Sequence, residues 1–212
     1  MKSAIWFVPV VAFAALALAG CSTEPKTPEA KANLHDDATA TIGKFERADT
    51  SMHDLLNNRA YGYAVFPKIG KGGAVVGGAY GKGEVYEQGK LIGYCDMTQA
   101  SVGLQLGGQS YSQLVVFSTK DAFDKLKSGN FSLGANASAV AATTGAAAAA
   151  RYQNGVAVFI TGEAGLMGEL SVGGQKFSFR PLEGTTPAPT EKTTIPPADN
   201  RNMNSNPPPS AL

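Results

Sequence analysis

The residues that could carry chemistry in this chain of 212 residues are few. The two histidines, His35 and His53, fall on one predicted helix about five turns apart, or ~27 Å, so they cannot share a metal ion. The two cysteines are Cys21 and Cys95, and no Cys/His cluster completes a ligand set. Cys95 has no signature of a catalytic nucleophile and is interpreted as a small buried residue. The sequence therefore predicts no metal site, no cofactor and no catalytic residue.

A glycine-rich stretch, residues 72–84, invites comparison with a phosphate-binding loop. Glycine lets backbone N–H groups approach an anion, but it also lets strands bend and pack closely. The segment Gly81-Lys82-Gly83 lacks the Ser or Thr of a P-loop, and the alternation through Val85 continues a strand where a dinucleotide site needs a helix. We therefore predict a bent β-hairpin. One nearly bare face of it would be formed by Val75, Gly77, Ala79 and Gly81, open to either a close-packed neighbour or an acyl chain.

The candidate lipid-binding residues are four lysines in or beside predicted turns, Lys68, Lys71, Lys82 and Lys90. If the four lysines share one edge of the sheet, each could add up to ~1 kcal/mol of attraction to the anionic head groups of a membrane. Lysines that only keep the turns soluble are an equally good interpretation of the same residues. A formal net charge of +1 gives the chain no global bias toward nucleic acid.

The N-terminus is typical of a lipoprotein signal peptide, residues 1–20. Lys2 supplies a short positive region, and the apolar run after it is short for a spanning helix, which needs ~20 residues. Leu18-Ala19-Gly20-Cys21 matches the bacterial lipobox, so we expect acylation of Cys21 with palmitate-type chains. Ser22 favours export onward to the outer membrane, where the protein would be lipid-anchored and face the periplasm. The alternative is an ordinary cleaved signal with a chance cysteine.

The rest of the chain divides by composition. Residues 21–33 are predicted to be a polar tether, and residues 184–212 a Pro/Thr/Asn-rich tail that is disordered. Between them, residues 34–183 form the predicted domain. Its length is enough to bury roughly two-thirds of its unfolded surface in one core.

Two helices are predicted in this domain. Apolar residues recur at three- or four-residue steps from Leu34 to Leu55, which indicates an amphipathic helix. Thr119 can cap a shorter helix that Gly129 ends. Residues 139–150 are rich in alanine but contain Thr-Thr-Gly, and they favour neither helix nor strand.

Short strands with a two-residue period make up the rest of the domain. Residues 60–66 read as a strand that Pro67 stops, and residues 114–117 are apolar on both faces and so central. Further strands are predicted at residues 102–106, 166–172 and 177–179. The predicted fold is α+β, with a curved antiparallel sheet or partial barrel, an N-terminal amphipathic helix and one or two shorter helices.

Several of these segments together resemble the SYLF family, a lipid-binding domain of eukaryotic actin-regulatory and endocytic proteins and of bacterial lipoproteins. The segments occur in family order: residues 60–67 (AYGYAVFP), 76–83 (VGGAYGKG), 101–109 (SVGLQLGGQ), 131–138 (FSLGANAS) and 165–168 (GLMG). The resemblance implies phospholipid binding and no enzymatic activity. The first helix is slightly acidic here, so the phosphoinositide and actin binding of eukaryotic members is not carried over.

We therefore expect a membrane-anchored lipoprotein whose SYLF-like domain binds phospholipid, either at the periplasmic membrane surface or in a cavity of its sheet. The alternative is a structural or stress-related envelope lipoprotein whose sheet edge or proline-rich tail binds a protein partner or peptidoglycan.

Overall fold

The computed structural model describes residues 25–73, 76–102, 109–129, 131–134, 137, 139–162 and 172–182. The helical elements are α1 (Pro28–Ala48), α2 (Ser51–Asp54), a π-helical turn (Leu55–Arg59) and α3 (Lys120–Lys127). The strands are β1 (Gly62–Gly73), β2 (Val76–Glu87), β3 (Lys90–Val102), β4 (Gln109–Phe117), β5 (Val140–Ala141), β6 (Val156–Gly162) and β7 (Lys176–Pro181). The expected signal peptide, Cys21 and the tail lie outside the described residues.

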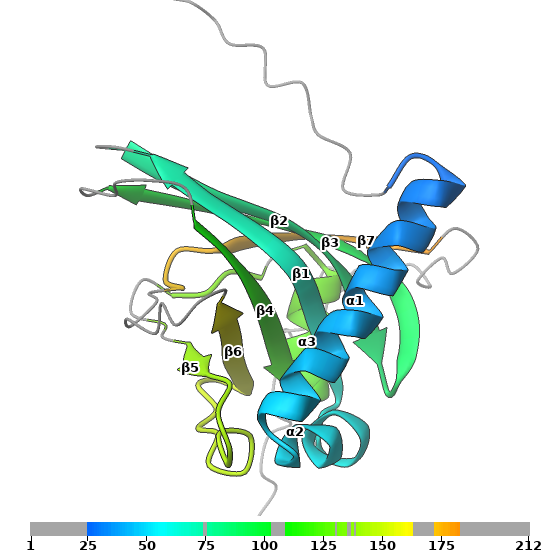
Figure 1. Cartoon of the computed structure of the whole chain (residues 1–212), viewed down its shortest axis with the longest axis vertical. Helices are drawn as coiled ribbons and strands as arrows, with labels where there is room; N and C mark the ends of the chain where they lie inside the picture. Colours follow the sequence, from blue (N-terminus) through cyan, green and yellow to red (C-terminus); the bar gives the residue numbers. More distant parts are fainter. Residues whose placement is uncertain are drawn as a thin grey trace, which may run out of the picture.

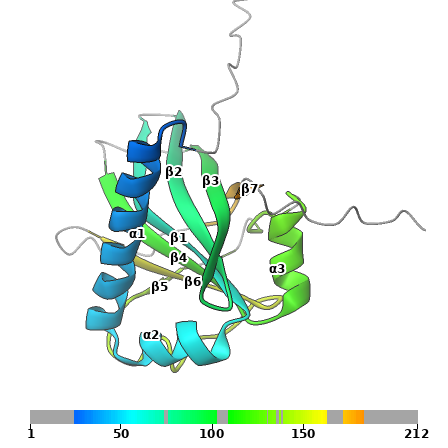
Figure 2. The ribbon, with the colours of Figure 1, turned by 90° about the vertical axis from the view of Figure 1, so that its right-hand side faces the viewer.

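The strands form one sheet in the order β5-β6-β4-β1-β2-β3-β7. Neighbouring strands are antiparallel, except that β5 and β6 are parallel. Figure 1 shows the strong curvature of the sheet, and Figure 2 shows α1 and α3 on opposite sides of it. The predicted α+β class with a curved sheet is confirmed, and the sheet is mixed and does not close.

The first helix begins earlier and ends earlier than predicted. Thr27 is its N-cap and accepts a hydrogen bond from the Ala30 N–H at 3.1 Å, and Pro28 opens the first turn. The last part of the predicted tether is therefore helical. α1 ends at Ala48, and α2 and the π-helical turn continue the chain after Asp49. None of the helices in the described residues has both the length and the apolar character needed to cross a bilayer.

The prediction that Pro67 stops the first strand is wrong, because β1 continues through it to Gly73. Pro67 lies where the pairing of β1 shifts register against both of its neighbours, between Val65 and Lys68 on one side and between Phe66 and Ile69 on the other. A bulge tolerates proline because its N–H is not needed for the ladder there.

Alternate side chains of each strand enter two separate cores. On β4, Leu114 and Val116 pack on the side of α1, while Val115 and Phe117 pack on the side of α3. The prediction of a central strand with two apolar faces is thereby confirmed. The α1-side core also takes in Phe45 of α1, and the α3-side core takes in the buried residues of α3.

The remaining elements were predicted unevenly. The capped helix is confirmed as α3, whose Thr119 accepts from the Ala122 N–H at 3.3 Å, and Gly129 follows it with a φ of +74°. The strand predicted around residues 177–179 is confirmed as part of β7. Residues 139–150 contain the two-residue strand β5 and turns. Most of the strands predicted at 102–106 and 166–172 lies outside the described residues, and β6 was not predicted.

Candidate functional site

The glycine-rich hairpin is closed by packing at Gly81 and Gly83, whereas Gly72 has open space where a Cβ would lie. β1 and β2 pair as the predicted hairpin. A Cβ on Gly81 would lie 2.6 Å from the Ile69 Cγ1, and one on Gly83 would lie 2.3 Å from the Val65 carbonyl oxygen. These glycines face the α3 side of the sheet and leave no room for a side chain, so a close-packed neighbour and not an acyl chain lies against them. Val75 lies outside the described residues.

The four predicted lysines do not form one cluster. Lys68 pairs with Lys82 across β1 and β2, and Lys71 lies further along β1. Lys90 pairs with Glu87 at the opposite end of β2. An acidic side chain, Asp37 of α1, lines the same shallow pocket as Lys68 and Lys82. Lipid binding by these lysines stays a prediction, and their arrangement does not concentrate all four charges at one edge.

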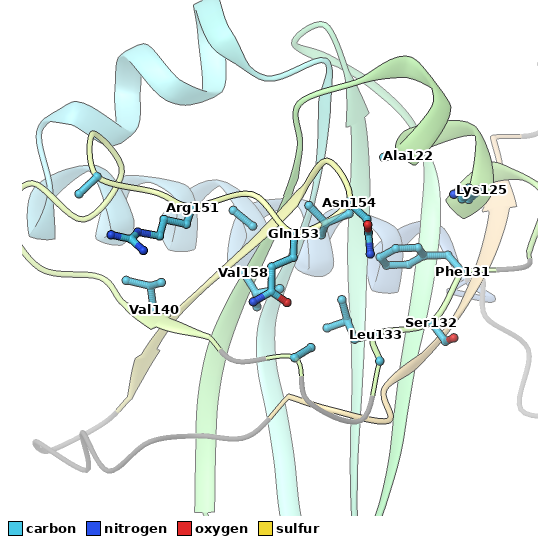
Figure 3. A pocket seen from close by; sticks show the side chains of 15 residues that line it. Ala122, Lys125, Phe131, Ser132, Leu133, Val140, Arg151, Gln153, Asn154 and Val158 are labelled. Carbon is cyan, nitrogen blue, oxygen red and sulfur yellow. The ribbon is translucent and has the colours of Figure 1, made fainter.

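A larger cavity of about 500 Å³ lies on the α3 side of the sheet (Figure 3). This volume is within the range of about 300–1,000 Å³ that small-molecule sites occupy. The apolar part of its lining is formed by Phe131, Leu133, Val140, Val156 and Val158. Because these side chains come from β5, β6 and the segment after α3, the cavity lies where the sheet edge meets that segment.

The segment after α3 is held in place by β7 and by aromatic packing. The Phe177 N–H donates to the Phe131 carbonyl at 3.3 Å, and Leu133 exchanges backbone hydrogen bonds of 2.9 and 3.0 Å with Gln175 and Gly174. The Phe131 ring lies 5.1 Å from the rings of both Phe117 and Phe177. This wall of the cavity is therefore part of the rigid core.

The opposite wall is held by Asp49, which lies between α1 and α2. Its carboxylate accepts hydrogen bonds from the N–H groups of Ala147 at 2.6 Å and Gly145 at 3.1 Å. Ser51 adds its N–H at 3.0 Å and its hydroxyl at 2.7 Å. Burial alone would raise the pKa of the Asp49 carboxyl, but these hydrogen bonds outweigh burial and hold the pKa below its ordinary value. The charged carboxylate thus fixes the turn that leads to Arg151.

Two cations and no acid line this cavity. In Figure 3, Arg151 and Lys125 lie at opposite ends of it, with Val158 and Leu133 between them. Both cations are exposed, and neither makes an ion pair within the part of the chain that the structure describes. Lys127, also on α3, does form an ion pair, with its Nζ 3.1 Å from a Glu87 oxygen. Lys125 thus differs from this neighbouring lysine in having no acidic partner among the residues described. The cavity combines an apolar floor with two cations that make no ion pair within the described residues.

Comparison with known families identifies this part of the molecule. Residues 98–184 match the Ysc84 family, described as "Las17-binding protein actin regulator". This segment belongs to the Ysc84, or SYLF, family. The match takes in α3, β6 and β7 and all of the cavity lining, and it confirms the predicted SYLF resemblance.

A curated protein to which this chain is similar is Beta cell expansion factor A from Aeromonas veronii. It is 31% identical to this chain over 157 residues, which are 72% of this chain and 59% of the relative. The chain thus spans less than two thirds of the length of that relative. The SYLF family as a whole relates to lipid binding and to actin regulation.

The other reactive side chains among the described residues are not assembled into a site with the cavity. Cys95 is fully buried in the α3-side core, where burial and the charge of Asp96 raise the pKa of its thiol well above the ordinary value. His35 lies across the sheet, with its Nδ1 3.2 Å from the Glu84 Oε2. The prediction that Cys95 is a small buried residue is confirmed. Among the described residues, no three His, Cys, Asp or Glu side chains are placed to hold a metal ion.

Sequence reasoning missed the cavity and both of its cations. Lys125, Val158 and Arg151 come from three separate segments of the SYLF domain, and no local motif joins them. The sequence does contain one pattern that could have predicted the strand forming the floor of the cavity. Residues 156–160 form an apolar run, preceded by Asn154-Gly155 and followed by Thr161-Gly162. Such a run between turn residues is typical of a buried strand. Asn154 and Gly155, with φ of +51° and +80°, form the tight turn that begins β6.

Proposed function

We propose that this chain is a membrane-anchored SYLF lipoprotein whose domain binds phospholipid through the cavity beside α3. The observation that carries the proposal is the pairing of an apolar floor with the cations Lys125 and Arg151, which make no ion pair among the described residues. Phospholipids present the matching chemistry, which is a hydrocarbon chain next to an acidic phosphate. The relation of the SYLF family to lipid binding supports the same assignment.

Two forces contribute to such binding. Each methylene that leaves water for the apolar floor adds about 0.8 kcal/mol. A hydrogen bond between a phosphate oxygen and an arginine or lysine adds about 1.5–3 kcal/mol, because one or both groups are charged. The hydrocarbon therefore supplies most of the affinity, and the cations select lipids with an acidic head group.

The anchor is the second part of the proposal. Acylation of Cys21 would place the chain on the periplasmic side of the outer membrane, a few residues before the start of α1 at Pro28. Cys21→Ser is expected to release the protein from the membrane fraction of cells, measured by fractionation and immunoblotting. Retention of the variant in that fraction would contradict the anchor.

Phospholipid binding is tested apart from the anchor with the mature chain carrying Cys21→Ser. We expect it to sediment with vesicles of phosphatidylglycerol and phosphatidylethanolamine, and to carry phospholipid in native mass spectrometry after mild extraction. Vesicles of phosphatidylcholine alone are the control for the charge of the head group. Absence of the protein from both the vesicle pellet and lipid-bound ions would contradict the proposal.

A further inference from the structure

We propose that the cavity holds a single acyl chain whose acidic group binds Arg151, so that its ligand is a monoacyl anionic lipid such as a fatty acid or a lysophospholipid. This inference rests on the proposed function and narrows it, from phospholipid in general to one chain with one acidic end.

The volume of the cavity sets the number of chains. A water-sized group takes about 30 Å³ of liquid volume, so a cavity of about 500 Å³ holds roughly 17 such groups. A methylene is comparable in size to a water molecule, and one long acyl chain therefore fills the space. A lipid with two chains of that length exceeds it by a factor of about two on the same reckoning.

The shape of the lining sets the direction of the chain. Figure 3 shows the apolar side chains Leu133 and Val158 in the middle of the cavity, between a cation at each end. Val140 lies beside Arg151, and Phe131 lies toward Lys125. A chain that follows this apolar strip necessarily brings its head group to one of the two cations.

The surrounding charges favour Arg151 over Lys125 as the partner of the acid. Asp121 lies one helical turn before Lys125 on α3 and weakens the positive field there. Along the chain around Arg151, by contrast, no acidic residue lies between Asp124 and Glu163. The Asp49 carboxylate that holds the wall carrying Arg151 already accepts four hydrogen bonds. The planar guanidinium also binds a carboxylate or a phosphate with two parallel hydrogen bonds, which an ammonium group cannot do.

The wall that carries Arg151 is fixed before any ligand arrives. Asp49 holds Gly145 and Ala147, and Ala149, two residues before Arg151, already lines the cavity. A side chain on an anchored segment loses less conformational freedom when it binds a ligand, and this raises affinity. The neutral polar groups of Gln153 and Asn154 line the same cavity and add no opposing charge.

The test uses the mature chain carrying Cys21→Ser and three soluble probes, each titrated below its micelle concentration by calorimetry. The probes are palmitate, palmitoyl-lysophosphatidylglycerol and the uncharged palmitoyl glycerol. We expect one site for each charged probe and binding of the uncharged probe weaker by roughly 10- to 100-fold. Comparison of the dissociation constants of the two charged probes shows whether the site prefers a carboxylate or a phosphate head group.

Matched variants locate the ligand. Arg151→Gln should weaken both charged probes by roughly 10- to 100-fold and leave palmitoyl glycerol unchanged. Lys125→Gln should weaken them by less than about threefold, and Arg47→Gln, which removes an exposed cation from α1 on the other side of the sheet, should have no effect. Val140→Trp should abolish binding of all three probes, because Val140 is 41% exposed and a larger side chain there can fill the cavity mouth without disturbing the core.

The possible failures are distinguishable. If vesicles bind and neither monoacyl probe does, the single-chain ligand is wrong and the proposed phospholipid binding stands. If neither vesicles nor probes bind, both proposals are wrong. Equal binding by Arg151→Gln and the parent chain, or a larger loss in Lys125→Gln, overturns the placement of the acid at Arg151. Unchanged binding by Val140→Trp, with a normal circular dichroism spectrum, overturns the cavity as the site.

Discussion

On the face of the sheet that α1 covers, one oxygen of a buried acidic side chain has two partners within the chain, whereas the cations at the cavity on the other face make no ion pair among the described residues. Glu84 is fully buried, and its Oε2 accepts from the Tyr86 hydroxyl at 2.6 Å and lies 3.2 Å from the His35 Nδ1. Arg151 and Lys125 line an open cavity instead. The first arrangement satisfies one oxygen of Glu84 inside the fold, while its Oε1 is buried without a hydrogen-bond partner among the described residues, and the second leaves charge available to a ligand.

The polar groups buried on the α3 side are neutral, which sharpens this contrast. Gln113 and Gln175 exchange two side-chain hydrogen bonds of 2.8 and 3.1 Å, and Gln175 also reaches Gln99 at 3.4 Å. These amides tie the segment before β7 to the middle of the sheet without adding charge. The potential of the cavity is therefore set by the two cations at its ends.

The largest expected effect comes from Asp49, which ties the end of α1 to residues 145–147. Asp49→Ala should lower the free energy of unfolding by about 3 kcal/mol, because it removes a charged acceptor from four buried or half-buried donors. Urea denaturation measures the change. Asp37→Ala, which removes an exposed carboxylate from α1, should cost less than about 0.5 kcal/mol and serves as the control.

The same side chain predicts a dependence on pH. Because the pKa of Asp49 is lower in the folded state than its ordinary value of 3.8, its contribution is complete above that value and is lost as the pH falls through the folded pKa. The difference in stability between the parent chain and Asp49→Asn should therefore be constant from pH 5 to 7 and shrink below about pH 4. A difference that grows toward acid pH would contradict the role of the carboxylate.

The next prediction tests the buried carboxylate of Glu84 on the α1 face. Tyr86→Phe should cost about 2 kcal/mol, since it removes a hydrogen bond to a buried carboxylate and leaves that oxygen with His35 alone. Burial and the bond to Glu84 both raise the pKa of Tyr86, so the hydroxyl stays protonated as a donor. Tyr152→Phe is the matched control, because the Tyr152 ring is only half-buried. Equal losses in the two variants would show that the bond to Glu84 contributes nothing.

Another prediction tests the neutral network on the other face. Gln113→Leu should cost about 1–2 kcal/mol, because it leaves the buried amide of Gln175 without its reciprocal partner. The double variant Gln113→Leu/Gln175→Leu should recover most of that loss, since replacing both partners by apolar groups is nearly neutral. Thermal unfolding of the two variants measures the stability of each. A double variant that is less stable than Gln113→Leu would contradict a mutual pair.

The smallest expected effect is at the cavity itself. Arg151→Gln should change the free energy of unfolding by less than about 0.5 kcal/mol, because the guanidinium is exposed and makes no ion pair within the described residues. The same variant is expected to weaken the binding of acidic lipids. A large loss of stability in urea would mean that Arg151 serves the fold, and the contrast between the two faces would then disappear.

Sequence patterns predicted the elements better than the site. Apolar residues at three- or four-residue steps revealed α1, and Thr119 with Gly129 marked α3, because helix faces and caps are local features. The start of α1 was missed although Thr27-Pro28-Glu29 is a typical helix start. The course of β1 beyond Pro67 depends on a bulge against two neighbouring strands, which no local pattern displays.

The candidate site was beyond reach of the sequence for a related reason. Lysines near turns were chosen by their local context, but the sheet register separates Lys90 from Lys68 and Lys82. The cavity depends on how the sheet edge meets segments from elsewhere in the chain, and Arg151 follows the alanine-rich run whose structure the sequence left open. The residues that line the cavity are brought together only when segments distant in the sequence pack against one another.

The hydrogen bonds of Asp49 also bear on the order in which the molecule is assembled. The bond to Ala147 joins residues 98 positions apart, and β1 to β5 and α3 lie in the interval. Closing so long a loop costs entropy that the intervening sheet must first offset with its own contacts. The wall of the cavity that carries Arg151 is therefore completed late in folding. Pulse-labelled hydrogen exchange should show the amide of Ala147 protected after those of β1 and β2.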